Sequence, residues 1–341
     1  MIKTALENKL NALKIPAAVT DIKENDFNMS FYLRLAPEVT INKLRARCED
    51  LSIFFAAPVT IETENGVICL KVANNNRPAV GIYPFTCDIA GGMAGYEIPL
   101  IIGKTENGTR LYYDLIKTPH LLAAGATGSG KSVFMHNCIL SALYSSKTTV
   151  VLIDVKKVEF SIYEGLPHLA APICYDTKSA YNTLNALIEN MQTRYNILQE
   201  NGARNIQEYR KNGGKMNYIT VFIDELADLF LCNKRIEKSV VRLAQLGRAA
   251  GIHLVLATQR PDATIINGLI RANIPSRVCF AVQKATDSRI VLDTAGGEKL
   301  RGAGDGFFMP IGSKSQIHFQ APYITTDALN NAVELARHCN D

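Results

Sequence analysis

The 341-residue chain lacks any long hydrophobic run. No stretch approaches the roughly 20 apolar residues that a helix needs to span a bilayer. The N-terminal segment carries Glu7 and has no continuous apolar core, so it does not match a secretory signal peptide. We therefore expect a chain without membrane insertion, located in the cytoplasm.

Paired cysteine spacings are also missing. The eight cysteines are scattered, with no C-x-x-C motif and no paired Cys/His spacing of the kind that binds zinc. Several of them fall within apolar strand or helix patterns, where a reduced cysteine serves as a small core residue. This excludes a disulfide scaffold or zinc module as the basis of the fold and agrees with a cytoplasmic chain.

The chain has little net charge and no internal repeat. Residues 1–95 hold ten Lys/Arg and ten Asp/Glu, so the formal net charge of +5 comes wholly from residues 96–341. A basic excess there is compatible with a polyanionic partner. Many enzymes without such a partner have a similar charge, so this observation alone decides little.

Residues 1–87 read as a small α+β domain, and the glycine-containing segment 88–96 reads as a linker. The expected helices span residues 5–13 and 41–51, and the expected strands span residues 29–35, 57–62 and 67–72. The dipeptide Asn65-Gly66 between the last two strands favours a hairpin turn.

From residue 97 onward strands alternate with helices, which predicts an α/β domain over 97–325 with a mostly parallel central sheet. A C-terminal helix is expected in the segment 326–341. The expected strands are residues 120–124, 149–153, 218–223, 252–257, 277–282 and 306–309.

The most informative motif is G-x-x-x-x-G-K-[ST], the phosphate-binding loop of nucleotide triphosphatases. An apolar strand precedes the motif and an amphipathic helix follows it, so a helix N-terminus would point at an anion. Lys131 would reach the β- and γ-phosphates and Ser132 would ligate Mg²⁺, which makes ATP and Mg²⁺ the expected cofactors. The alternative is a flexible Gly/Ser turn. The residues of the motif are Gly125, Ala126, Thr127, Gly128, Ser129, Gly130, Lys131 and Ser132.

Two acids follow the apolar strand at residues 218–223. In open α/β sheets ligands bind at the carboxyl ends of the strands, which is where this strand would deliver them. Asp224 is a candidate Mg²⁺ ligand, and Glu225 is a candidate general base for the attacking water. The alternative is that Asp224 merely caps the next helix.

A polar residue also follows the strand at residues 252–257. Gln259 would lie between the two strands that carry the loop and the acids, and it is our candidate sensor of the γ-phosphate. The alternative is an ordinary loop residue that forms hydrogen bonds.

Several runs resemble the FtsK/SpoIIIE family of DNA-pumping ATPases, over about residues 97–310. Residues 33–62 more faintly resemble the small domain that precedes the motor in that family. The resemblance implies a RecA-like motor that forms a homohexameric ring, through which ATP hydrolysis moves double-stranded DNA. The runs are Arg248–Pro261, Leu269–Arg277, Asp287–Asp293, Ile153–Lys156 and Tyr163–His168.

The resemblance also implies roles for four arginines. Arg248 matches the arginine finger that one subunit donates to the γ-phosphate of its neighbour. Arg260, Arg271 and Arg289 match basic positions in loops that face the DNA channel. The alternatives are solvated surface arginines or, for Arg289, a second phosphate sensor.

The chain departs from the family pattern in three places. Val155 stands where the family commonly has proline, and the transmembrane anchor and the winged-helix module of full-length members do not occur. We therefore expect a protein of a phage, plasmid or other mobile element, with a separate recruitment protein. Two alternatives remain: a conjugation- or secretion-type coupling ATPase that recruits a protein or nucleoprotein, and a non-catalytic DNA-binding ring. The second is disfavoured because Lys131, Asp224 and Glu225 are all present.

Overall fold

The computed structural model describes residues 1–64, 66–145, 147–313 and 315–338, except the side chain of Glu64. The chain divides into two compact units, one of residues 1–79 with 106–109 and one of residues 80–105 with those from 110 onward. The boundary precedes the expected linker, and residues 88–90 of that linker belong to helix α4 (Tyr83–Ala90). As functional domains, the ranges 1–87, 97–325 and 326–341 stay predictions.

The N-terminal unit is an antiparallel sheet with the strand order β1-β2-β4-β3, packed on three helices among the described residues. Strand β1 was not expected, and the helix expected over 41–51 is broken between α2 and α3. Strands β3 and β4 pair as the hairpin predicted; Asn65 itself lies outside the described residues. The bounds are α1 Ile2–Ala12, β1 Ala17–Glu24, β2 Asn28–Leu35, α2 Ile41–Arg45, α3 Cys48–Phe55, β3 Val59–Glu64 and β4 Val67–Ala73.

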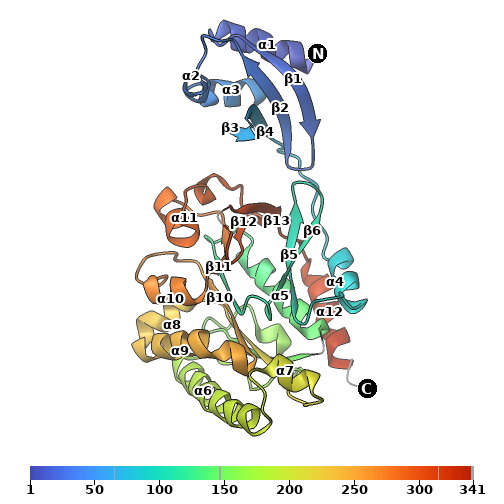
Figure 1. Ribbon diagram of the computed structural model, residues 1–341, viewed down its shortest axis with the longest axis vertical. Coiled ribbons are helices and arrows are strands. Elements are labelled where there is room, and N and C mark those ends of the chain that lie inside the picture. The colour runs from blue at the N-terminus through green and yellow to red at the C-terminus, as the bar shows by residue number, and fades with distance from the viewer. Residues whose placement is uncertain (65, 146, 314, 339–341) are drawn as a thin grey trace. The chain divides into compact units, whose positions relative to one another are not determined.

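The second unit is built on one sheet with the order β6-β5-β13-β12-β11-β7-β10-β9-β8 (Figure 1). Neighbours from β11 to β8 run parallel, whereas those from β11 to β6 run antiparallel. The expectation of a mostly parallel sheet is therefore wrong, because the sheet is mixed. The bounds are β5 Pro99–Thr105, β6 Arg110–Asp114, β7 His120–Ala124, β8 Thr148–Ile153, β9 Tyr218–Ile223, β10 Ile252–Thr258, β11 Ser276–Phe280, β12 Asp305–Met309 and β13 Ile317–Gln320.

Helices cover both faces of the parallel strands, which explains why β7, β9, β10 and β11 are buried along their whole length. Alternate residues of β10 point to opposite faces: Val255 packs with helix α5, and Leu254 packs with α6 and α9. The helices are α5 Lys131–Tyr144, α6 Thr177–Glu200, α7 Ile206–Lys211, α8 Leu226–Cys232, α9 Lys234–Ala250, α10 Gly268–Asn273, α11 Ala285–Leu292 and α12 Thr326–His338.

The strand order decides which loops meet. Strand β10 pairs with β7 on one side and with β9 on the other, all three in parallel. Their carboxyl ends therefore lie at one edge of the sheet, and the loops that follow them are neighbours.

Candidate nucleotide site

The glycine-rich loop joins β7 to helix α5 and needs glycine at specific positions. Gly128 and Gly130 have φ of +77° and +100°, a region that side chains disfavour. A Cβ atom on Gly130 would also lie 2.3 Å from the backbone nitrogen of Gly304, whose N–H donates to the Ser129 carbonyl at 2.8 Å. The loop thus keeps its shape because a second glycine segment packs against it.

The N-terminus of α5 has the properties of an anion site. No side chain among the described residues caps it at Gly130, and its first amides have no intrahelical acceptor. The hydroxyl of Ser129 is buried and lacks a hydrogen-bond partner within the described part of the chain. Unsatisfied donors at a helix N-terminus suit phosphate oxygens, so the residues present fit a bound triphosphate.

The sequence predicted that Lys131 and Asp224 share one site, and the structure brings them into contact. Both are buried, at 3% and 2% exposure. The Lys131 ammonium donates to the carboxylate Oδ1 and to the backbone oxygen of Asp224, each at 3.0 Å. Burial raises the pKa of the Asp224 carboxyl, and the Lys131 charge opposes that rise. Ser132 follows Lys131, so a hydroxyl and a carboxylate, both hard oxygen ligands suited to Mg²⁺, come from adjoining elements.

Glu225 also lies in the site, and it fills the helix-capping role that the alternative gave to Asp224. Its side chain caps α8 by accepting from the Ala227 amide at 3.3 Å. The same carboxylate accepts from the Thr258 hydroxyl at 2.6 Å and from the Gln259 amide at 2.9 Å. The helix cap is therefore Glu225, and Asp224 is left facing the loop.

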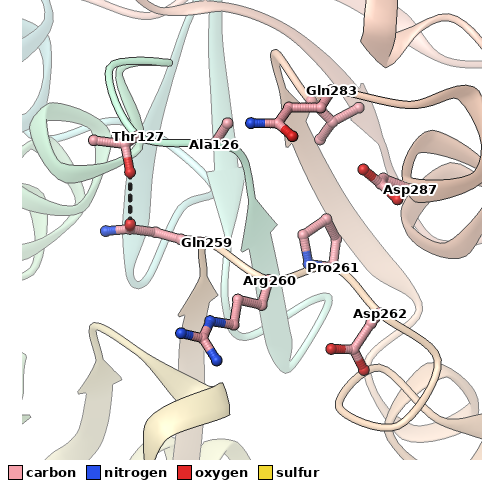
Figure 2. A pocket seen from close by; sticks show the side chains of 9 residues that line it. Ala126, Thr127, Gln259, Arg260, Pro261, Asp262, Gln283 and Asp287 are labelled. Carbon is pink, nitrogen blue, oxygen red and sulfur yellow. Dashed lines mark hydrogen bonds between the residues drawn. The ribbon is translucent and has the colours of Figure 1, made fainter.

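Gln259 lies where the sequence placed it, after the strand between β7 and β9. Its side-chain oxygen accepts a hydrogen bond of 2.9 Å from the Thr127 hydroxyl (Figure 2). This contact closes one side of a cavity of about 440 Å³ next to the loop. The cavity is lined by Ala126, Thr127, Gln259, Arg260, Pro261, Asp262, Val282, Gln283 and Asp287.

A third strand end contributes residues of the run Ile153–Lys156, for which the sequence predicted no role in the site. Asp154 follows β8, is 1% exposed and accepts hydrogen bonds from the backbone amides of residues 156 through 160. The loop that it holds brings Lys156 to 3.6 Å from the Glu225 carboxylate. An acid directly after an apolar strand is the same signal that identified Asp224, so the sequence could have revealed Asp154.

The same loop places Glu159 beside the nucleotide loop. The His136 imidazole, one turn into α5 from Ser132, lies 3.4 Å from the Glu159 carboxylate. The pKa of Glu159 is lowered, first by its hydrogen bond with His136 and further by the Ser132 hydroxyl and the Lys131 charge. Another carboxylate therefore adjoins the expected Mg²⁺ ligands.

The structure places Arg248 at the other edge of the sheet. It is exposed near the end of α9, just before β10 begins, and its guanidinium donates to the Lys117 carbonyl at 3.2 Å. The amino ends of the parallel strands lie there, whereas the glycine-rich loop follows their carboxyl ends.

The other three arginines have different surroundings. Arg260 is exposed and lines the cavity, and Arg289 is exposed on α11. Arg271 is half-buried and forms an ion pair with Asp293, which also binds Arg277 at 2.8 Å. The guanidinium of Arg271 is therefore already paired within the chain, with a carboxylate that it shares with Arg277.

The loop, the facing lysine–aspartate contact and the strand order make this chain a P-loop ATPase with a mixed α/β sheet. Within that class it belongs to the FtsK/SpoIIIE family, whose model matches residues 96–263. Within the described residues, no helix has the length and apolar character needed to cross a membrane.

The relatives extend this match along nearly the whole chain. DNA translocase FtsK of Oceanobacillus iheyensis is 44% identical over 98% of the chain, and DNA translocase SpoIIIE of Bacillus subtilis is 35% identical over 96%. The chain spans 45% and 44% of the lengths of these two relatives.

Solved structures show the same fold. The pCW3 conjugation coupling protein TcpA, in a monomer form with ATPγS, has a TM-score of 0.71 and 24% identity over 98% of this chain and 99% of its own. The cytoplasmic domain of the type VII secretion ATPase EccC of Thermomonospora curvata has a TM-score of 0.64 and 26% identity, over 71% of this chain and 31% of its own.

Proposed function

We propose that this chain is an ATP-driven double-stranded DNA translocase, with a RecA-like motor that works as a homohexameric ring. The observation that carries the proposal is the alignment of 98% of the chain with a DNA translocase at 44% identity. The alignment includes the segment in which Lys131 contacts Asp224.

In this proposal the glycine-rich loop and the first amides of α5 hold the phosphates. Lys131 exchanges its contact with Asp224 for the β- and γ-phosphate oxygens, while Ser132 and Asp224 hold Mg²⁺. A Mg²⁺ ion held by Ser132 and Asp224 would supply positive charge against the negative charge that develops on the phosphates. Glu225 accepts a proton from the attacking water, and Gln259 links the γ-phosphate position to the loop after β10.

Arg248 acts on a neighbouring subunit. Because it lies at the edge of the sheet opposite to its own glycine-rich loop, its guanidinium would serve the site of the next subunit in the ring. A guanidinium supplied in this way contributes about 10³–10⁵ in rate. ATP hydrolysis would then depend on assembly.

DNA contacts come from Arg260 and Arg289, with a smaller contribution from the already paired Arg271. Such contacts read backbone phosphates and carry no base information, so movement along DNA would not depend on sequence. A separate recruitment protein, a cytoplasmic location and a mobile-element origin stay predictions.

The test compares ATPase rates with duplex DNA, with single-stranded DNA and without DNA. The proposal expects the largest stimulation by duplex DNA. A second candidate is a secretion-type coupling ATPase, which the likeness to EccC favours at 26% identity. Stimulation by a partner protein but not by duplex DNA would select that candidate instead.

A further inference from the structure

Groups of the chain engage both oxygens of the Glu225 carboxylate. Its two oxygens offer about four lone-pair sites. They face the Thr258 hydroxyl at 2.6 Å, the Gln259 amide at 2.9 Å, the Ala227 amide at 3.3 Å and the Lys156 ammonium at 3.6 Å. The Thr258 hydroxyl donates the shortest of these hydrogen bonds, and a carboxylate oxygen held in this way is a weaker acceptor for a proton from water.

The Thr258 hydroxyl, which makes the shortest of these contacts, has a second acceptor nearby. The hydroxyl carries one proton, which can go to Glu225 at 2.6 Å or to the Arg260 carbonyl at 3.4 Å. In the structure it donates to Glu225 and accepts from the Arg260 amide at 3.1 Å. Rotation of the hydroxyl about the Thr258 Cβ–Oγ1 bond would therefore move its hydrogen bond from the Glu225 carboxylate to the Arg260 carbonyl.

Backbone and side-chain hydrogen bonds also connect residues Thr258 and Gln259 to the glycine-rich loop. The Thr258 carbonyl accepts from the Gly125 amide at 3.2 Å, and the next residue, Gln259, bonds to Thr127. Arg260 is exposed and lines the cavity, so a ligand outside the subunit could bind its side chain and displace the Gln259–Arg260 segment.

We propose that Thr258 is a positioning residue that keeps Glu225 from acting as a base until the Gln259–Arg260 segment moves. Displacement of Arg260 by a polyanion draws the hydroxyl to the Arg260 carbonyl and removes the shortest hydrogen bond from the carboxylate, which makes that oxygen a better acceptor for a proton from water. This inference rests on the proposed function, in which Glu225 is the base and Arg260 contacts DNA.

The test uses Thr258→Val, which keeps the branched shape and removes the hydroxyl, and Thr258→Ser, which restores it. Thr258→Val should raise the DNA-free kcat several-fold at unchanged KM, and the ratio of rates with and without duplex DNA should fall towards one. Thr258→Ser should behave as the unaltered protein. Should the valine variant melt early, Thr258→Ala provides the same readout.

A matched control is Thr220→Val. Thr220 is a buried threonine of β9 whose hydroxyl bonds to Thr148 at 3.0 Å, away from the site. Thr220→Val should leave the ratio of ATPase rates with and without duplex DNA unchanged. Affinity for a fluorescent ATP analogue with Mg²⁺ should be the same in all variants, and deuterium uptake at residues 257–262 without nucleotide should rise only where the hydroxyl is lost.

The possible outcomes separate the two claims. A DNA-free kcat that stays equal or falls in both Thr258→Val and Thr258→Ala overturns the inference, whatever DNA does. Absence of duplex-DNA stimulation in the unaltered protein overturns the proposed function instead. A third outcome is a raised DNA-free kcat with an unchanged ratio of rates with and without duplex DNA. It would support the restraint of Glu225 by Thr258 and contradict the coupling of that restraint to Arg260.

Discussion

The Lys131 ammonium and the Asp224 carboxylate form a buried ion pair at 3.0 Å across the edge of the parallel sheet. Removing one partner of such a pair leaves an uncompensated charge in the interior, which costs about 3–5 kcal/mol. The residue that is expected to bind phosphate therefore also stabilises the folded site.

Lys131→Ala should abolish productive ATP binding and lower the free energy of unfolding. The loss follows because Asp224 stays buried without its partner. Titration with a fluorescent ATP analogue and urea unfolding measure the two effects. Lys178→Ala, an exposed lysine of α6, is the control and should change neither.

Glu225→Gln should bind ATP normally and hydrolyse it about 10²–10⁴ times more slowly, because the amide cannot accept the proton. Its side-chain oxygen can still cap α8, so the fold should persist. Single-turnover hydrolysis measures the effect, and bound ATP should remain trapped. Hydrolysis at the unaltered rate would refute the general-base role.

Arg248→Ala should lose most ATPase activity while leaving each subunit folded, because the side chain is exposed. When the variant is mixed with unaltered subunits, ATPase activity should fall by more than the fraction of variant subunits, since each defective subunit disables the site of a neighbour. Activity is measured against the mixing ratio. A strictly proportional decline would argue against a finger donated between subunits.

Stability should fall in acid because of two buried histidines. Burial lowers the pKa of His120 to about 3 and that of His253 to about 4. The unfolded chain takes up protons below its pKa of about 6.5 while the folded chain does not, so stability is complete above that pH and is lost as the pH falls. At pH 5 each histidine costs about 2 kcal/mol. Urea unfolding at pH 7 and pH 5 should show this loss, and His253→Phe should reduce it.

The arginines should differ in their effect on DNA affinity. Arg260→Ala should weaken duplex binding and flatten its dependence on salt concentration, because it removes a phosphate contact. Arg271→Ala should change both less, since its guanidinium is already held by the Asp293 carboxylate. Binding measured over a range of salt concentrations tests this. Equal slopes for the two variants would contradict the assignment.

The sequence predicted the parts of this fold in which one continuous apolar run precedes a motif. Strands β7, β9 and β10 and the start of α5 lie within a residue or so of their predicted positions, and the Lys131–Asp224 contact follows from them. Strands β5, β6 and β13 were missed: β13 has four residues, and β5 begins at a proline. The antiparallel strands β5 and β6 join the sheet through β13, a partner distant in the sequence, and this turned the expected mostly parallel sheet into a mixed one.

The contacts of Glu225 could not be predicted from the sequence either. Thr258 ends strand β10, whereas Lys156 lies in the loop after β8, and the two meet at Glu225 only because β8, β9 and β10 are neighbours. No local pattern marks a threonine at the end of a strand as anything other than a core residue.

The central claim is that ATP hydrolysis in this chain moves double-stranded DNA. Displacement of a third strand from a triplex tests it most directly, because only a motor that travels along the duplex removes that strand. The strand should be displaced in the presence of ATP, and Glu225→Gln should not displace it. Assembled protein that hydrolyses ATP in the presence of duplex DNA yet never displaces the strand would contradict it.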